Sequence, residues 1–146
     1  MTKGRALVLV GTALYVVAWL VSVHKDGQSS MLPGWEAFAL ALWPYGSSDA
    51  WYTGVHIIAS AMTNFFLVGA LVLVYVVRRS PPRVLRGILI ASSVLNTHWF
   101  VFGELREGLR IGYYFWAGSF FLVATGLVLE ARRAGGSSES AIATGL

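Results

Sequence analysis

Two long apolar runs joined by a short basic turn constrain this chain more than any other feature. Residues 51–77 carry no charge, and residues 84–103 carry one, Arg86, close to the start of the run. The turn between the runs contains Pro81 and Pro82, which cannot continue a helix. About twenty apolar residues are enough to cross the roughly 30 Å hydrocarbon core of a bilayer as a helix. The segment therefore predicts a membrane hairpin of two antiparallel helices.

The composition of the whole chain agrees with a location in the bilayer. Of its 146 residues, 56% are hydrophobic and 12% are charged, which is about half the charged share of a soluble domain. The chain has no cysteine, so disulfides, iron–sulfur ligation and cysteine nucleophiles are excluded. The formal net charge is +4, but the basic residues lie at the ends of apolar runs rather than on one surface. Nucleic acid is therefore not an expected partner.

Further apolar runs complete the predicted fold. Residues 6–23 are long enough to span the bilayer, and they exceed the apolar region of a usual signal peptide, so we expect a retained helix. The stretch 33–43 is too short to span and is rich in aromatic residues, which is typical of an interfacial helix. The fold class expected is an all-α membrane protein: an up-down bundle of four transmembrane helices (6–23, 51–77, 84–103 and 111–129), with a short interfacial helix at 33–43.

The distribution of charge predicts the orientation. We expect one transmembrane domain, residues 1–133, followed by a Gly- and Ser-rich disordered cytoplasmic tail, residues 134–146. Cytoplasmic loops of membrane proteins carry an excess of Lys and Arg. With both termini inside, the inner face holds Lys3, Arg5, Arg78, Arg79, Arg83, Arg86, Arg132 and Arg133, whereas the outer face holds Lys25, Arg106 and Arg110. The pattern predicts a protein of the bacterial cytoplasmic membrane with both termini cytoplasmic.

Histidines are candidate ligands in the outer half of the predicted bundle. His24, His56 and His98 fall at the outer ends of three different segments, near Glu36 and Glu104. Two histidines on adjacent antiparallel helices suit a haem, and three with a carboxylate suit zinc or copper. The alternative is an interfacial histidine without a ligand, with its apolar ring in the membrane and its polar tip near water. No His-x-x-x-His spacing occurs, so the interfacial interpretation is favoured.

Asparagines lie near the middle of the predicted hairpin. Asn64 and Asn96 are at similar depth in adjacent spans, and we expect them to meet. They are interpreted as hydrogen-bonding groups that join packed helices, or alternatively as a patch for the head of a quinone, a lipid or a proton. Asn96 and His98 lie about 200° apart around a helix. We therefore predict that an Asn64–Asn96 pair and a His56–His98 pair exclude one another.

Aromatic residues gather at the predicted outer ends of the spans. They are Trp35, Trp43, Trp51, Tyr52, Trp99, Phe100, Phe102, Tyr113, Tyr114 and Trp116. Such residues form a belt at the membrane–water interface. The alternative is an aromatic-lined pocket beneath the helix 33–43, with Glu36 or Glu104 as its polar group.

Small residues and one acidic residue complete the set of positions with expected contacts. Gly11, Ala18 and Gly118 suit close approach of neighbouring helices. Glu130 precedes Arg133 by three residues, so the two are expected to form a surface pair.

Two short patches resemble small bacterial four-span membrane proteins of unknown function. They are Leu32-Pro33-Gly34-Trp35, and Gly112-Tyr113-Tyr114-Phe115-Trp116 at the start of the last span. The resemblance implies no activity and no site residue.

Common catalytic motifs do not occur in the sequence, so a binding or structural role is favoured over catalysis. The chain has no G-x-S-x-G, H-E-x-x-H or Gly-rich phosphate loop. The first hypothesis is a non-enzymatic accessory subunit or self-associating bundle, as a homo-oligomer or in a larger membrane complex. The second is a redox or ligand-binding protein that holds haem, metal or quinone near His56 and His98. The third is a lipid-handling protein with an outer-leaflet pocket. The candidate ligand-binding residues are His56, Asn64, Asn96, His98, Glu36 and Glu104.

Overall fold

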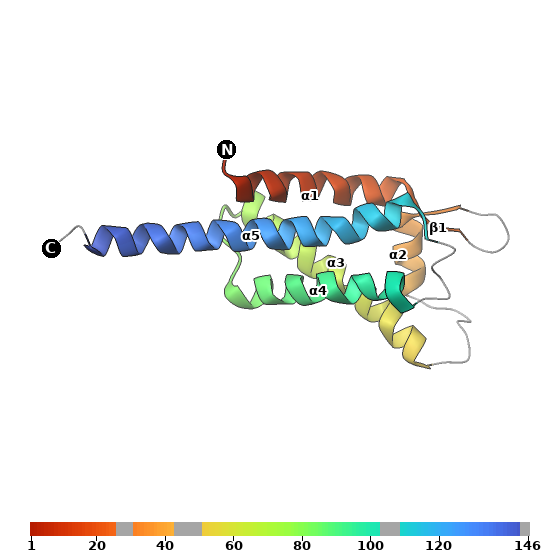
Figure 1. Cartoon of the computed structure of the whole chain (residues 1–146). Helices are drawn as coiled ribbons and strands as arrows, with labels where there is room; N and C mark the ends of the chain where they lie inside the picture. The colour runs from red at the N-terminus through yellow and green to blue at the C-terminus, as the bar shows by residue number, and fades with distance from the viewer. Residues whose placement is uncertain (26–30, 43–50, 103–108, 144–146) are drawn as a thin grey trace.

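The computed structural model describes residues 1–25, 31–42, 51–102 and 109–143, and these are mostly helical (Figure 1). In chain order the elements are α1 (Lys3–Leu20), β1 (Ser22–Lys25), β2 (Met31–Pro33), α2 (Gly34–Leu42), α3 (Trp51–Tyr75), α4 (Arg83–Phe102) and α5 (Ile111–Ala143). The predicted all-α class is confirmed. The predicted helices 6–23, 33–43, 51–77 and 84–103 each correspond to one observed helix, with ends that differ by a few residues.

Among the described residues, three helices are long and apolar enough to cross a membrane. The spans are Lys3–Leu20, Val55–Tyr75 and Ile111–Gly135. The structure thus supports a transmembrane protein in general. The helix α4 is not among the three spans found in the described part of the chain. The predicted count of four spans is therefore not confirmed by length and composition.

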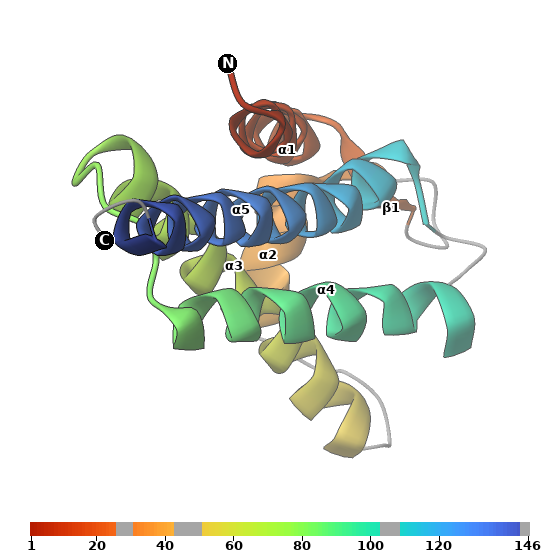
Figure 2. The same ribbon diagram turned by 60° about the vertical axis from the view of Figure 1, so that its left-hand side comes forward.

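The long helices run up and down along one axis. α1 and α4 run one way and α5 runs the opposite way between them, whereas α3 crosses obliquely (Figures 1 and 2). The short helix α2 lies across the end of the bundle where α1 ends and α5 begins. The shared core consists of Val8, Tyr15, Leu67, Ala70, Leu89, Phe120, Val123, Ala124 and Leu127.

The pair α1 and α5 packs through glycine. A Cβ atom on Gly126 would lie 2.6 Å from the carbonyl oxygen of Gly4, and one on Gly11 would lie 2.8 Å from a methyl group of Val123. Small residues let backbones approach closely in membrane bundles, and this confirms the expectation for Gly11. Gly118 was also expected at a close contact, but a Cβ there meets nothing within 4 Å. That part of the prediction is wrong.

A short hairpin joins the ends of three helices. β1 and β2 pair antiparallel, with His24 opposite Leu32. The backbone N–H of Gly34 donates to Val21 O at 3.2 Å, and that of Arg110 donates to Val23 O at 3.0 Å. The fold expected from the sequence contains only helices, so these two strands were not predicted. Because the chain becomes extended after Leu20, α1 also ends earlier than the predicted residue 23.

The last helix is longer than predicted. Its expected end was residue 129, but α5 continues to Ala143 and so includes most of the segment 134–146 that was expected to be a disordered tail. The polar residues after Leu129 do not interrupt the helix. The division into one transmembrane domain and a cytoplasmic tail remains a prediction.

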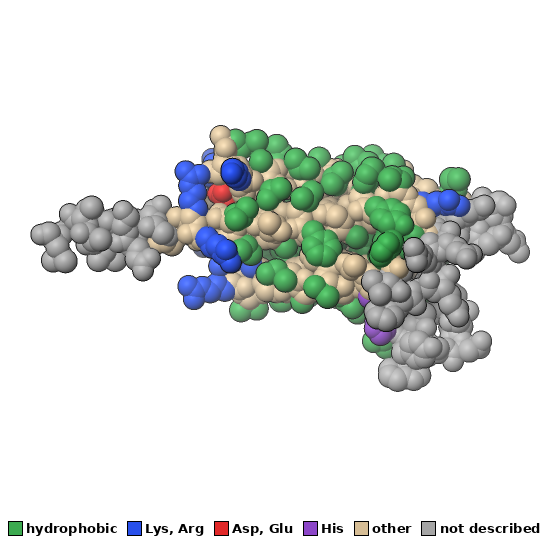
Figure 3. Space-filling view, viewed as in Figure 1, with side chains coloured by type: hydrophobic (Ala, Val, Ile, Leu, Met, Phe, Trp, Pro, Cys, Tyr) green, Lys and Arg blue, Asp and Glu red, His purple; other side chains and the backbone are tan. Residues whose placement is uncertain are grey.

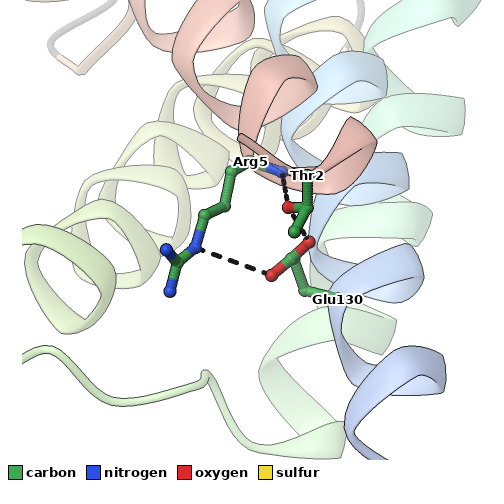
Figure 4. A network of polar contacts seen from close by, with 3 residues as sticks. All are labelled: Thr2, Arg5 and Glu130. Carbon is green, nitrogen blue, oxygen red and sulfur yellow. Dashed lines mark hydrogen bonds and ion pairs between the residues drawn. The ribbon is translucent and has the colours of Figure 1, made fainter.

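Glu130 connects α5 to the first turn of α1 (Figure 4). Its carboxylate accepts a hydrogen bond from the Thr2 hydroxyl and lies 3.7 Å from Arg5 Nε. Thr2 is the N-cap of α1, and its hydroxyl oxygen accepts from the backbone N–H of Arg5 at 3.1 Å. The expected surface pair with Arg133 is therefore an incomplete account of Glu130, which also makes a contact between two helices.

The ion pair at Glu130 is expected to contribute little to stability. Glu130→Gln should lower the free energy of unfolding by no more than about 1 kcal/mol, because exposed pairs are worth about 0–1 kcal/mol and the Arg5 side chain is 76% exposed. Glutamine also keeps an oxygen that can accept from Thr2. Unfolding of the purified protein in detergent, at low and high salt, measures the change. A loss above about 2 kcal/mol would contradict the assignment to a weak exposed pair.

Candidate functional site

Asn64 connects three helices from the middle of α3. Its side chain is 5% exposed. The Oδ1 atom accepts hydrogen bonds from the Tyr15 hydroxyl of α1 at 3.1 Å and from Trp116 Nε1 of α5 at 2.9 Å. Its Nδ2 atom donates to Ala61 O within α3 at 2.9 Å. A buried amide satisfied in this way fixes the relative positions of α1, α3 and α5.

Asn96 makes the corresponding connection from α4. Its side chain is fully buried. Its Oδ1 accepts from the Ser60 hydroxyl at 2.9 Å, and its Nδ2 donates to Thr63 Oγ1 at 3.1 Å. Its backbone carbonyl accepts from the Tyr113 hydroxyl at 2.5 Å. Asn96 therefore links α4 to α3 through its side chain and to α5 through its backbone.

The expected direct contact between the two asparagines is wrong. Each is satisfied by other partners, and among the described residues no hydrogen bond joins them. The partners that the sequence analysis missed are Tyr15, Tyr113 and Trp116. Two of them had been assigned to the interfacial belt. These contacts could have been expected from the sequence, because a buried Tyr or Trp needs a hydrogen-bond acceptor for its O–H or N–H group. The buried asparagines provide these acceptors.

His56 and His98 do meet. Their rings stack with centroids 5.0 Å apart and planes inclined by 14°. The predicted exclusion is correct in one respect, since Asn96 has no bond to Asn64 when the histidines are in contact. It is wrong in another, because Asn96 and His98 both contact α3. The helix α3 crosses α4 obliquely, so the line of contact moves around α4 along its length (Figure 2).

The histidine pair does not have the geometry of a metal site. Imidazole binds a metal or haem iron through a ring nitrogen, along the plane of the ring. Two rings that face one another do not direct their nitrogens at one point between them. Within the described part of the chain, no three His, Asp or Glu residues form a cluster that could hold a metal. The backbone of His24 belongs to β1, and Glu104 lies outside the described residues.

A pocket lies beneath α2, where the third hypothesis from the sequence placed one. It is a cavity of about 210 Å³, lined by residues of α1, α2, α3 and α5 together with Val23 and Leu109. The helix α2 contributes Gly34, Ala37, Phe38 and Ala41, which recur at helical spacing and so share one face. The predicted polar group is not the observed one. Glu36 does not line the cavity, and its polar side is formed by Ser60, Asn64, Tyr113 and Trp116.

Contacts at the start and in the middle of α2 hold it over the pocket. A Cβ atom on Gly34 would lie 2.2 Å from Ala18 O, so only glycine allows this approach of α2 to α1. The ring of Phe38 lies 5.2 Å from the Trp19 ring of α1 and 5.9 Å from the Phe65 ring of α3, centroid to centroid. The small side chains of Ala37 and Ala41 leave the space that the cavity occupies. The pocket is therefore a product of residue sizes on one face of α2.

Comparison with protein-family models, with curated proteins and with solved structures finds no match to this chain. What the fold and the site define is a helical protein with three membrane-length helices, a buried network around two asparagines, and a mainly apolar pocket next to that network.

Proposed function

We propose that this chain is a four-span membrane protein that binds a small, mainly apolar molecule in the pocket beneath α2. The observation that carries the proposal is the position of the pocket, which places the Asn64 amide in the wall of a mainly apolar cavity of about 210 Å³. Apolar clefts with a few convergent polar groups are typical of ligand sites.

The burial pattern of α4 supports a fourth span. At about 1.5 Å per residue, its 20 residues extend for about 30 Å, the thickness of the hydrocarbon core. Its polar residues Ser92, Ser93 and Asn96 are buried within the bundle, whereas Ile90 and Val94 are exposed. Polar residues of membrane helices face the bundle interior. Two arginines at its start reduce the hydropathy of the whole helix without placing charge at its middle.

The position of the basic residues supports the proposed orientation. Figure 3 shows Lys and Arg side chains gathered at the end of the bundle where α1 begins. The turn between α3 and α4 lies at the same end (Figure 1). Under the positive-inside rule this end is cytoplasmic, which agrees with the bacterial cytoplasmic membrane as the location. The pocket beneath α2 lies at the opposite end, at the depth of the outer leaflet.

The size of the cavity limits what it holds. An engineered cavity of roughly 150 Å³ holds benzene, and sites for drug-sized ligands begin at roughly 300 Å³. A cavity of about 210 Å³ therefore fits one ring with small substituents, or a short lipid segment. A larger ligand would place its head in the cavity and leave its tail in the bilayer.

The polar side of the cavity limits which polar head group a ligand can have. An amide nitrogen carries two N–H groups, and Asn64 Nδ2 donates one of them to Ala61 O. The second can donate to a carbonyl oxygen inside the cavity. The fitting ligand class is an apolar molecule with a carbonyl head, such as a quinone or a lipid ester. The proposal involves binding and no chemical reaction. It is therefore compatible with the hypothesis that the protein is a non-enzymatic accessory subunit or a self-associating bundle.

Two alanines of α2 provide a matched test. Ala41 lines the cavity, whereas Ala39 is exposed on the same helix and does not. Ala41→Phe should fill the cavity and weaken binding of a short-chain quinone at least ten-fold, measured by quenching of the fluorescence of Trp19 and Trp116, which also line it. Ala39→Phe should bind as the unaltered protein does.

Two outcomes would contradict the proposal. The first is equal quenching in both variants, because filling the cavity would then have no effect on binding. The second is a Soret band or stoichiometric metal that disappears in His56→Phe, which would favour the redox hypothesis at the histidine pair instead. Mass spectrometry of organic extracts from the purified protein identifies a retained quinone or lipid.

A further inference from the structure

A second groove lies between α4 and α5, on the side of the bundle away from α2. It has a volume of about 330 Å³. From α4 it is lined by Ile90, Ser93 and Val94, and from α5 by a row that begins at Phe121 and ends at Arg132. Val94 is 65% exposed, so the groove is open along its side rather than enclosed.

The length of the groove matches the depth of one leaflet. Phe121 and Arg132 are separated by three helical turns, or about 16 Å at about 1.5 Å per residue. The hydrocarbon core of a bilayer is roughly 30 Å thick, so one leaflet contributes about half of this. The wall between the two residues is mainly apolar. An acyl chain of one leaflet would therefore lie along the groove for its whole length.

The charge at the end of the groove is positive. Arg132 lines the groove one turn beyond Leu129. It follows Glu130 by two residues, and Glu130 contacts Thr2 and Arg5 at the start of α1. Basic side chains gather at this end of the bundle (Figure 3). Arg83 and Arg86 lie at the start of α4, at the same end of the bundle. Basic groups between membrane helices at the cytoplasmic side attract the phosphates of anionic lipids.

We propose that this groove binds one acyl chain of an anionic glycerophospholipid of the inner leaflet, with the lipid phosphate against Arg132. The apolar wall accounts for the chain, and the guanidinium accounts for the preference for a net negative head group. The site is separate from the pocket beneath α2 and does not depend on a ligand there.

The test uses the full-length protein in detergent with phosphatidylglycerol as the probe and phosphatidylcholine of the same acyl chains for comparison. Native mass spectrometry and thermal unfolding measure binding. We expect saturable binding of phosphatidylglycerol and a larger rise in Tm than with phosphatidylcholine. Arg132→Gln should weaken phosphatidylglycerol binding about five-fold, the effect of one basic residue near a charged membrane surface. Arg132→Lys should restore most of it.

One groove-filling variant and two controls show whether the lipid binds in this groove. Arg79→Gln removes the same charge from an exposed position that does not line the groove, and it should leave binding within two-fold. Thr125→Phe fills the groove from an exposed position of α5, and it should abolish saturable binding of both lipids. Val72→Phe, on an exposed face of α3, should not.

Several results would overturn the proposal. Equal losses in Arg132→Gln and Arg79→Gln would mean that the lipid responds to total charge and not to this groove. Unchanged binding in Thr125→Phe would mean that the groove is not occupied. An equal effect of glycerol 3-phosphate would mean that an anion binds without an acyl chain. A dimer that Thr125→Phe converts to a monomer would assign the groove to a second copy of the chain. A variant that does not fold is replaced by Val94→Phe, which fills the groove from α4.

Discussion

Gly126→Ala is expected to lower the free energy of unfolding by about 1–3 kcal/mol, the usual cost of overpacking. The new methyl group would lie 2.6 Å from Gly4 O and 3.0 Å from Val8 N. Both are backbone atoms of α1, so no side-chain rotation relieves the contact. α1 and α5 must separate, and the contacts of Val8, Val123 and Leu127 in the core weaken with them. Thermal or denaturant unfolding in detergent micelles measures the loss.

Gly118→Ala is the matched control on the same helix. A Cβ atom there meets nothing within 4 Å, and alanine is a better helix former than glycine by about 0.5–1 kcal/mol. Stability should therefore stay unchanged or rise slightly. The two substitutions add the same atom to the same element, so opposite signs would locate the effect at the interface between α1 and α5. Equal losses from both would show that the interface is not tightly packed.

Asn64→Leu is expected to lower the free energy of unfolding by about 2–3 kcal/mol. The Tyr15 hydroxyl and Trp116 Nε1 lose their common acceptor, and an orphaned buried donor costs about 1–3 kcal/mol in general. Two orphaned donors would therefore cost about 2–6 kcal/mol together. Hydrogen bonds in membrane bundles contribute less than in water-soluble proteins, about 0.6 kcal/mol on average, so we expect a loss at the low end of this range. Leucine has a similar shape, so the loss reports the polar contacts rather than a cavity.

A double-mutant cycle separates the polar term from packing. Tyr15→Phe removes one of the orphaned donors, so the double variant with Asn64→Leu should be less destabilised than the sum of the single variants by about 0.5–1 kcal/mol. Tyr75→Phe serves as the control, because its hydroxyl lies 3.4 Å from Thr12 Oγ1 and far along the chain from this network. Its effect should add to that of Asn64→Leu. Additivity in both cycles would contradict a network centred on Asn64.

The helices could be predicted from the sequence because each depends on local information. Apolar runs of membrane length and the prolines at 81 and 82 define α3 and α4 without reference to the rest of the chain. The β1–β2 hairpin could not be predicted in this way. Its strands are only four and three residues long, and β1 accepts a hydrogen bond at Val23 O from the backbone N–H of Arg110, which is distant in sequence. The extension of α5 past residue 129 likewise contradicts its Gly- and Ser-rich composition.

The site was predicted in its polar residues but not in its connections. Burial of Asn64 and Asn96 follows from polar residues in apolar runs. The contact of His56 with His98 was one of two alternatives that the sequence left open. The choice of partners depends on the crossing angle of α3 over α4, which the sequence pattern does not contain. The same limit applies to the pocket. Its location under α2 was anticipated, whereas its polar group, Asn64 in place of Glu36, depends on how α2 rotates about its own axis.

Because α1 packs against α5, α1 leaves the ribosome long before its partner is synthesised. Thr2 and Glu130, which are in contact, are separated by 128 positions in the chain. At about 5–20 residues per second, roughly ten seconds pass between the synthesis of the two ends. During that interval the glycine face of α1 and the amide of Asn64 lack their final neighbours. Late assembly of this kind makes newly inserted chains a target for membrane chaperones and proteases, and variants that weaken the α1–α5 contact should be degraded faster after synthesis than the unaltered chain.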